Sequence, residues 1–135
     1  MAERMIETQA QLSEWVREQF QRANKYLAEQ GILFETVVTE ESRYLAPHVA
    51  LWKIKSTDGE FFWVTSGEVI CDVMPAETEA TARAAMKNFS FKWQLEAENL
   101  LRSNVTSDEQ KSHAQSMIKN AETLYQVQAK DELWV

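Results

Sequence analysis

Few residues in this chain could do nucleophilic or acid–base chemistry. There is one cysteine, Cys71, and there are two histidines, His48 and His113. A cysteine nucleophile needs a base within hydrogen-bond reach, and nothing in the sequence places either imidazole beside Cys71. Because free cysteine is among the most buried residue types, we interpret Cys71 as an apolar filler of core space. A single cysteine also excludes an internal disulfide.

Metal, nucleotide and paired-carboxylate chemistry are not indicated either. Zinc sites need three or four nitrogen, sulfur or carboxylate ligands, whereas the two histidines fall in separate predicted elements without a partner motif. The three glycines lie too far apart for a phosphate-binding loop. Carboxylate pairs such as Glu40-Glu41 lack a third group that would tune a pKa. We therefore predict no metal, no cofactor and no catalytic residue.

The best candidate for a ligand or partner site surrounds the segment Leu45-Ala46-Pro47. Arg43, Tyr44 and His48 bring a guanidinium, a phenol and an imidazole together beside an aromatic strand. The alternative interpretation is structural: Arg43 pairs with a neighbouring glutamate and Tyr44 covers the edge of the sheet. Most arginine and aromatic residues at a surface are not binding hot spots, so both interpretations stay open.

Composition and charge restrict the class of protein. The chain has 135 residues, of which 44% are hydrophobic and 26% are charged, as in an average soluble globular domain. Its 14 basic and 21 acidic residues give a net charge of −7, which argues against binding to a nucleic-acid backbone. No run of eighteen apolar residues exists, and residues 1–11 lack the pattern of a signal peptide. We expect a cytoplasmic protein that does not bind membranes.

Two of three predicted helices have clear ends. Apolar residues recur every three or four positions from Thr8 to Gln30, and Gly31 ends this helix because glycine enters the left-handed conformation without a Cβ clash. Another helix begins after the capping box at residues 107–110 (SDEQ) and ends near Ala129.

Between these helices the pattern changes to strands. Residues 32–38 and 48–56 are rich in β-branched and aromatic side chains, and Asp58-Gly59 supplies the positive φ of a tight hairpin turn. A turn centred on these two residues pairs strand 48–56 with strand 60–66, with Ile54 opposite Trp63. The core face of that hairpin would then hold Trp52, Ile54, Phe61 and Trp63. We predict a small antiparallel sheet of two or three strands in an α+β fold, with residues 1–135 forming a single domain.

The remaining helix, predicted from about Ala76 after Pro75, is apolar on two sides. Its large apolar residues are Phe89, Trp93 and Leu100 on one side, and Phe91 and Leu95 on another. A helix of this kind is usually sandwiched between partners. The third helix can cover part of the second side, and a second copy of the chain can cover what remains.

The C-terminal segment Leu133-Trp134-Val135 adds apolar surface after three charged residues. A terminal segment stays ordered only when it docks. It docks either on its own chain or on a second copy, since two-fold dimers are the commonest soluble oligomers.

Several segments of the sequence resemble those of a known family. They are EESRYLAPHVALWKIKS-DG (residues 40–59), a following strand with tryptophan and then SGE, TAR-AM--FS--WQL-AE-L (residues 81–100), and the terminal LWV. Together they are similar to short gammaproteobacterial proteins classed as a domain of unknown function, over nearly the whole chain. The resemblance implies a compact bacterial domain, and it implies no activity, cofactor or catalytic residue.

Two hypotheses on function follow. The favoured one is a non-enzymatic interaction module, self-associating as a homodimer, because five tryptophans and six phenylalanines are more than a small core easily hides. No other protein partner can be named from the sequence. The alternative is a small ligand-binding protein or enzyme with a pocket near Arg43, Tyr44 and His48. A deep cavity with a polar rim would favour the alternative, and a flat apolar face would favour the interaction module.

Overall fold

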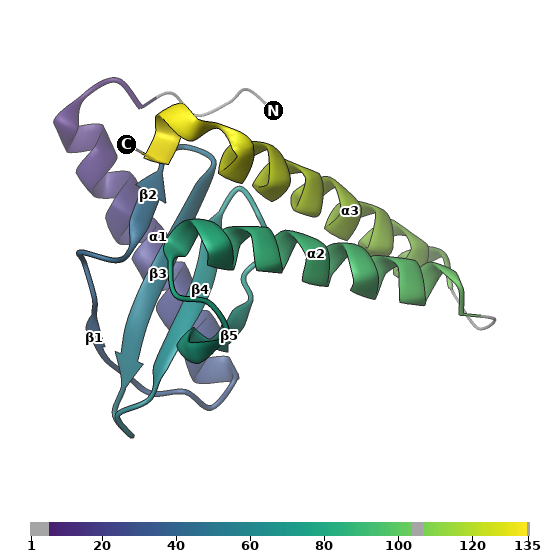
Figure 1. Ribbon diagram of the computed structural model, residues 1–135, viewed down its shortest axis with the longest axis horizontal. Helices are drawn as coiled ribbons and strands as arrows, with labels where there is room; N and C mark the ends of the chain where they lie inside the picture. Colours follow the sequence, from purple (N-terminus) through teal and green to yellow (C-terminus); the bar gives the residue numbers. More distant parts are fainter. Residues whose placement is uncertain (1–5, 104–106, 135) are drawn as a thin grey trace. The chain divides into compact units, whose positions relative to one another are not determined.

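The computed structural model of the chain describes residues 6–103 and 107–134 (Figure 1). Within these ranges the fold is α+β, as predicted. The helices are α1 (Gln9–Glu29), α2 (Ala82–Leu101) and α3 (Asp108–Ala129), with short 3-10 turns at η1 (Ala76–Thr78) and η2 (Asp131–Trp134). The strands are β1 (Phe34–Val37), β2 (Arg43–Leu45), β3 (Val49–Ser56), β4 (Phe61–Gly67) and β5 (Val73–Pro75). The fold divides into two compact units, with the boundary between Ala82 and Arg83.

Helix α1 begins and ends where the sequence predicts. Thr8 caps it by accepting a hydrogen bond from the Gln11 backbone N–H at 3.1 Å, and the Gln11 side chain accepts from the Thr8 N–H at 3.0 Å. This reciprocal pair is a capping box. At the other end Gly31 follows the helix with a φ of +80°.

The sheet is antiparallel and has five strands, in the order β1-β3-β4-β5, with β2 also paired to β3. The prediction of two or three strands is therefore wrong. The strands that were missed, β2 and β5, have three residues each, which is too short to show a periodic pattern. Both β1 and β2 pair with β3, because β3 is long enough to hold two short partners one after the other.

The register of the β3–β4 hairpin also differs from the prediction. Trp63 lies opposite Lys53, not Ile54, and Trp52 lies opposite Val64. The loop has three residues, Thr57 to Gly59: the Ser56 N–H donates to the Glu60 carbonyl at 2.8 Å, and Gly59 takes a φ of +85°. A one-residue change of register turns every side chain of a strand to the other face. Trp63 and Phe61 therefore lie on the face opposite to Trp52 and Ile54.

Helix α1 lies against one face of the sheet (Figure 1), and its buried side chains pack with Trp52 on that face. The buried residues of this core are Trp15, Ala23, Leu27, Ala50, Trp52, Ile54 and Val64. A chain of two buried hydrogen bonds joins the two layers. The Trp52 indole N–H donates to Ser66 Oγ at 3.0 Å, and Ser66 Oγ donates to the Gln19 carbonyl at 3.0 Å. Ser66 therefore satisfies one polar group from each layer of the core.

The base of the β3–β4 hairpin depends on Gly67. Its φ is +115°, and a Cβ added there would lie 2.8 Å from both the His48 carbonyl oxygen and the Val49 Cα. The Gly67 carbonyl accepts a hydrogen bond from Arg22 of α1. A residue without a side chain thus allows the close approach of the two strands at this end.

In the second unit α2 and α3 lie side by side (Figure 1). Ser90 Oγ of α2 donates to the Ala121 carbonyl of α3 at 2.7 Å, and Arg83 Nε donates to the Gln128 carbonyl at 2.7 Å. The predicted ends of α3 are confirmed, including the capping box of Ser107 with Gln110.

The predicted start of α2 near Ala76 is wrong. Residues Ala76–Thr78 form only a 3-10 turn, and Glu79 is extended with a φ of −142°. The Glu79 carbonyl accepts a hydrogen bond from the Trp63 indole N–H at 3.0 Å. This contact holds the chain against the sheet, so the helix begins only at Ala82.

Two buried serines allow a test of the hydrogen bond between Trp52 and Ser66 in the core. Ser66→Ala should lower the free energy of unfolding by about 1–3 kcal/mol, because it leaves the buried Trp52 N–H without its acceptor. Ser56 is 3% exposed and its Oγ has no hydrogen-bond partner among the described residues. Ser56→Ala should therefore change stability by less than about 0.5 kcal/mol, or raise it. Urea unfolding of both variants measures this, and equal losses would contradict the assignment.

Candidate functional site

The most organised group of polar contacts in the first unit surrounds Lys53, at the point where β1 gives way to β2 along β3. The Lys53 N–H donates to Ser42 Oγ at 2.8 Å, and its carbonyl accepts from the Val38 N–H at 2.7 Å. Ser42 Oγ in turn donates to the Val38 carbonyl at 2.9 Å. A serine side chain thus replaces the missing strand partner of Lys53 and fixes the 38–42 loop to the sheet.

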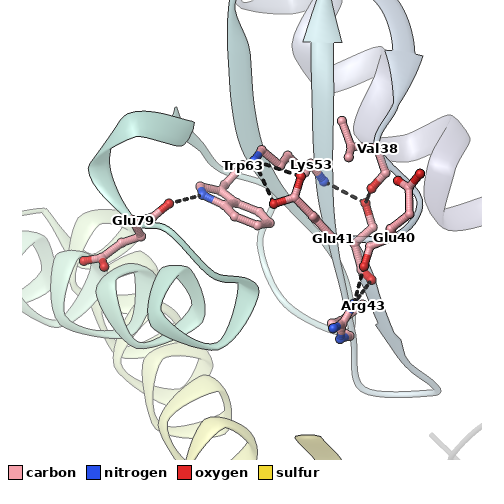
Figure 2. Close-up of polar contacts among 8 residues, drawn as sticks. Val38, Glu40, Glu41, Arg43, Lys53, Trp63 and Glu79 are labelled. Atoms are coloured by element: carbon pink, nitrogen blue, oxygen red, sulfur yellow. Dashed lines mark hydrogen bonds and ion pairs between the residues drawn. The ribbon is translucent and has the colours of Figure 1, made fainter.

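The Lys53 side chain is held on the Trp63 face of the sheet, as Figure 2 shows. Its Nζ lies 3.1 Å from each carboxylate oxygen of Glu41, and only 18% of the side chain is exposed. The same Nζ lies 5.4 Å from the Trp63 ring centroid and 5.8 Å from that of Phe61, within the range of a cation–π contact. Lys53 is therefore a positioned cation between one carboxylate and two aromatic rings.

Sequence reasoning missed this group. The predicted two-residue turn placed Trp63 on the same face as Trp52, and therefore on the face opposite to Lys53. Glu41 is twelve residues away in the sequence, so no local spacing connects it to Lys53. The correct hairpin register would have brought Lys53 and Trp63 together.

A cavity of about 470 Å³ opens beside Lys53. Its lining residues are Lys53, Gly59, Glu60, Phe61, Phe62, Pro75, Ala76 and Glu77. They come from β3, the hairpin loop, β4, β5 and the following 3-10 turn. Its volume lies in the range of small-molecule sites, and its lining mixes aromatic and carboxylate side chains.

Arg43, Tyr44 and His48 do not line this cavity, and the structure does not gather their side chains at one place. Arg43 and Tyr44 are neighbours in β2, so their side chains lie on opposite faces of the sheet. Arg43 Nη1 donates to the Glu40 and Ser42 carbonyls at 3.0 and 2.8 Å (Figure 2). The Arg43 guanidinium thus binds the backbone of its own loop.

Tyr44 and His48 contact different residues at different places. The Tyr44 ring lies 4.9 Å from the Trp52 ring, and burial raises the pKa of its phenol. His48 lies at the other end of the β2–β3 connection, where its Nδ1 is 3.8 Å from Glu68 Oε2. Tyr44 thus takes the structural role that the sequence left open, as a cover for the sheet. Binding by these three residues stays a prediction.

Cys71 is partly buried, between β4 and β5. Burial raises the pKa of its thiol; the positive charge of Arg22 lowers it, and the negative charges of Glu29 and Asp72 raise it. The net direction is upward, so the unreactive thiol form is favoured at neutral pH. This agrees with a structural role, although the side chain is less enclosed than a core filler would be.

The second unit has an exposed apolar surface. Phe91 and Leu95 of α2 are 50% and 59% exposed, and Tyr125 of α3 is 47% exposed. The Phe91 and Tyr125 rings lie 6.3 Å apart, at a cavity of about 390 Å³ that Ile118 also lines. We call Phe91, Leu95, Ile118 and Tyr125 the α2–α3 face. The second apolar side predicted for α2 is thus real, and in this chain it is open.

The C-terminal segment contacts its own unit. The Trp134 indole N–H donates to the Val127 carbonyl at 3.3 Å, and the Arg83 guanidinium lies 5.8 Å from its ring. Arg83 Nη2 also binds Asp131 Oδ1 at 2.6 Å. Leu133 remains 38% exposed, and Val135 lies outside the described residues. Trp134 thus docks on its own chain, and self-association through this segment stays a prediction.

Across 6–103 and 107–134, no group of three or more histidine, cysteine, aspartate or glutamate residues could hold a metal ion. In the same part of the chain, no helix combines the length and the apolar character that crossing a membrane requires.

Most of the chain matches the model of a known family. The model of a family described as "Domain of unknown function (DUF4826)" matches residues 9–134, a range that covers most of each compact unit. No curated protein and no solved structure matches the chain.

The Trp63 contacts can be separated by two substitutions. Trp63 is fully buried, so Trp63→Ala should lower the free energy of unfolding by about 3–5 kcal/mol. Trp63→Phe keeps a buried ring but loses the hydrogen bond to Glu79, and it should cost about 1–2 kcal/mol. Thermal or urea unfolding tests both. An unchanged melting temperature for Trp63→Ala would contradict the burial of this ring.

The charges around Cys71 predict its reactivity. A disulfide reagent such as DTNB should label the native protein more slowly than the urea-unfolded protein at pH 8, because the raised pKa leaves less thiolate. Arg22→Gln should slow labelling of the native protein, and Glu29→Gln should accelerate it, each by less than about fivefold. Native labelling as fast as that of the unfolded chain would contradict the pKa direction.

Proposed function

The chain belongs to this family of unknown function, and we propose that it is a non-enzymatic protein-interaction module that self-associates through the α2–α3 face. The observation that carries the proposal is the exposure of Phe91, Leu95 and Tyr125 at about half of their surface each. Contiguous exposed apolar groups in a soluble protein mark interaction sites. Aromatic residues such as Phe91 and Tyr125 are also enriched at the centres of protein interfaces.

The shape of the α2–α3 face supports a protein partner. Phe91 and Leu95 are one helical turn apart and lie on the same side of α2. Ile118 and Tyr125 are two turns apart on α3, and the cavity between the helices is lined by residues of both. The face therefore offers two parallel rows of apolar side chains with a depression between them, which a helix of a partner can enter.

The charges at the edge of this face support a second copy as the partner. Lys87 Nζ lies 5.8 Å from the Phe91 ring, and Glu122 lines the cavity. In a two-fold symmetric contact every pair of residues occurs twice: residue i of each copy meets residue j of the other copy. Lys87 of each copy can therefore meet Glu122 of its partner. Such pairing offsets repulsion between two chains that each carry a net charge of −7.

Light scattering on the intact protein tests self-association. At micromolar concentration the mass should be about twice the 15.6 kDa of the chain. The double substitution Phe91→Ser with Leu95→Ser should reduce the mass to that of one chain, because it removes half of the apolar face while leaving the buried side of α2 intact. Circular dichroism of the variant checks that it is folded.

Two further variants locate the contact. Phe61→Ser replaces an aromatic residue that is also exposed, at 42%, but lies outside the α2–α3 face, and the mass should not change. Deleting residues 133–135 tests the C-terminal segment: we expect the mass to stay and stability to fall. A fall in mass after this deletion would move the contact to the C-terminus. A mass of 15.6 kDa for the intact protein across the micromolar range would refute self-association.

A further inference from the structure

The cavity beside Lys53 has an imbalance of charge. Glu60 and Glu77 line it, and within the described part of the chain neither carboxylate forms an ion pair or accepts a hydrogen bond. Lys53 is the one cation among the lining residues, and its Nζ already contacts both oxygens of Glu41. Counting Glu41 with the lining residues, three carboxylates face one ammonium. The local charge is therefore negative, and it favours a cationic ligand.

The aromatic part of the cavity also suits a cation. Phe61 lines the cavity and is 42% exposed, so part of its surface is open to a ligand. Lys53 Nζ lies 5.8 Å from this ring, which shows that the ring already accepts an ammonium group. Ring faces attract cations through their quadrupole, and the attraction grows as water is excluded.

The rest of the lining suits a short aliphatic chain. Phe62, Pro75 and Ala76 contribute apolar surface between the two glutamates and the hairpin loop. An anionic ligand would have to displace Glu41 from Lys53 and would then face Glu60 and Glu77. A neutral ligand would gain no charge–charge attraction from the two exposed carboxylates.

We propose that this cavity is a binding site for an alkylammonium group, carried either by a small aliphatic amine or by the side chain of a lysine. The ammonium lies between Glu60, Glu77 and the Phe61 ring, and the aliphatic part lies on Pro75 and Ala76. The site shares no residue with the α2–α3 face, because all of its residues belong to the first unit and the α2–α3 face belongs to the second.

Titration of the intact protein with cadaverine, followed by 15N–1H NMR, tests the proposal. Saturable shifts are expected for the backbone amides of residues 59–62, 76 and 77, with a dissociation constant on the order of millimolar, as for other very small ligands with few contacts. Pentanol, which is neutral, and valerate, which is anionic, have aliphatic chains of similar length and should give no saturable shifts at these residues. Raising the salt concentration should weaken cadaverine binding.

Three glutamate variants identify the carboxylates. Glu60→Gln and Glu77→Gln should each weaken cadaverine binding by about twofold to fivefold, as expected for one exposed charge contact. Glu68→Gln is the matched control, because Glu68 is an exposed glutamate of the same unit that contacts His48 and does not line the cavity. Binding by this control should be unchanged, and all three substitutions preserve side-chain size.

The source of the ammonium is distinguished by a second probe, an acetylated and amidated tripeptide with a central lysine. Tighter binding of this peptide than of cadaverine assigns the site to lysine side chains, and the reverse order assigns it to free amines. The proposal is overturned if neither probe gives saturable shifts, if valerate binds as well as cadaverine, or if Glu68→Gln weakens binding as much as Glu77→Gln. None of these readouts involves the mass of the protein, so they fail or succeed separately from the test of self-association.

Discussion

The register of one hairpin decides where most of the large side chains of the first unit lie. The three-residue loop between β3 and β4 places Lys53 opposite Trp63 and Trp52 opposite Val64. From this pairing it follows that Trp52 meets Ser66 and α1 on one face, while Trp63 meets Lys53 and the Glu79 carbonyl on the other. A two-residue loop would instead place Trp52 and Trp63 on the same face of the sheet, and the two indole N–H groups could not both keep their present acceptors.

The Lys53 group shows how a gap in the sheet can become a site. Two short strands share one edge of β3, and the residue between them would leave backbone groups unpaired, which is costly in a buried sheet. Ser42 and Val38 satisfy those groups. The loop that carries them also brings Glu41 over the Trp63 face, where it binds the Lys53 ammonium. The contacts that complete the sheet therefore also set the charge beside the cavity.

Sequence reasoning succeeded where the signal is local. The ends of α1 and α3 follow from a cap and a glycine or from a capping box, each contained in a few residues. It failed on the hairpin because Asp58-Gly59 fits two loops: a two-residue turn, or a three-residue loop in which only Gly59 has positive φ. It also missed β2 and β5, which are held by pairing rather than by their own pattern. The candidate cavity depends on that register and on contacts between distant residues, so it could not be predicted from spacing alone.

The two ends of the β3–β4 hairpin tolerate sequence change differently. At the tip, a Cβ added to Gly59 would meet nothing within 4 Å, so an asparagine, which accepts positive φ more easily than most residues, has room there. At the base, Gly67 combines a φ of +115° with a 2.8 Å approach to the His48 and Val49 backbone, where no flexible side chain can move aside. Substitutions can therefore remodel the tip, including the loop beside the cavity, while the geometry of the base requires glycine. The loop beside the cavity can thus change in sequence without a change in the register of the hairpin.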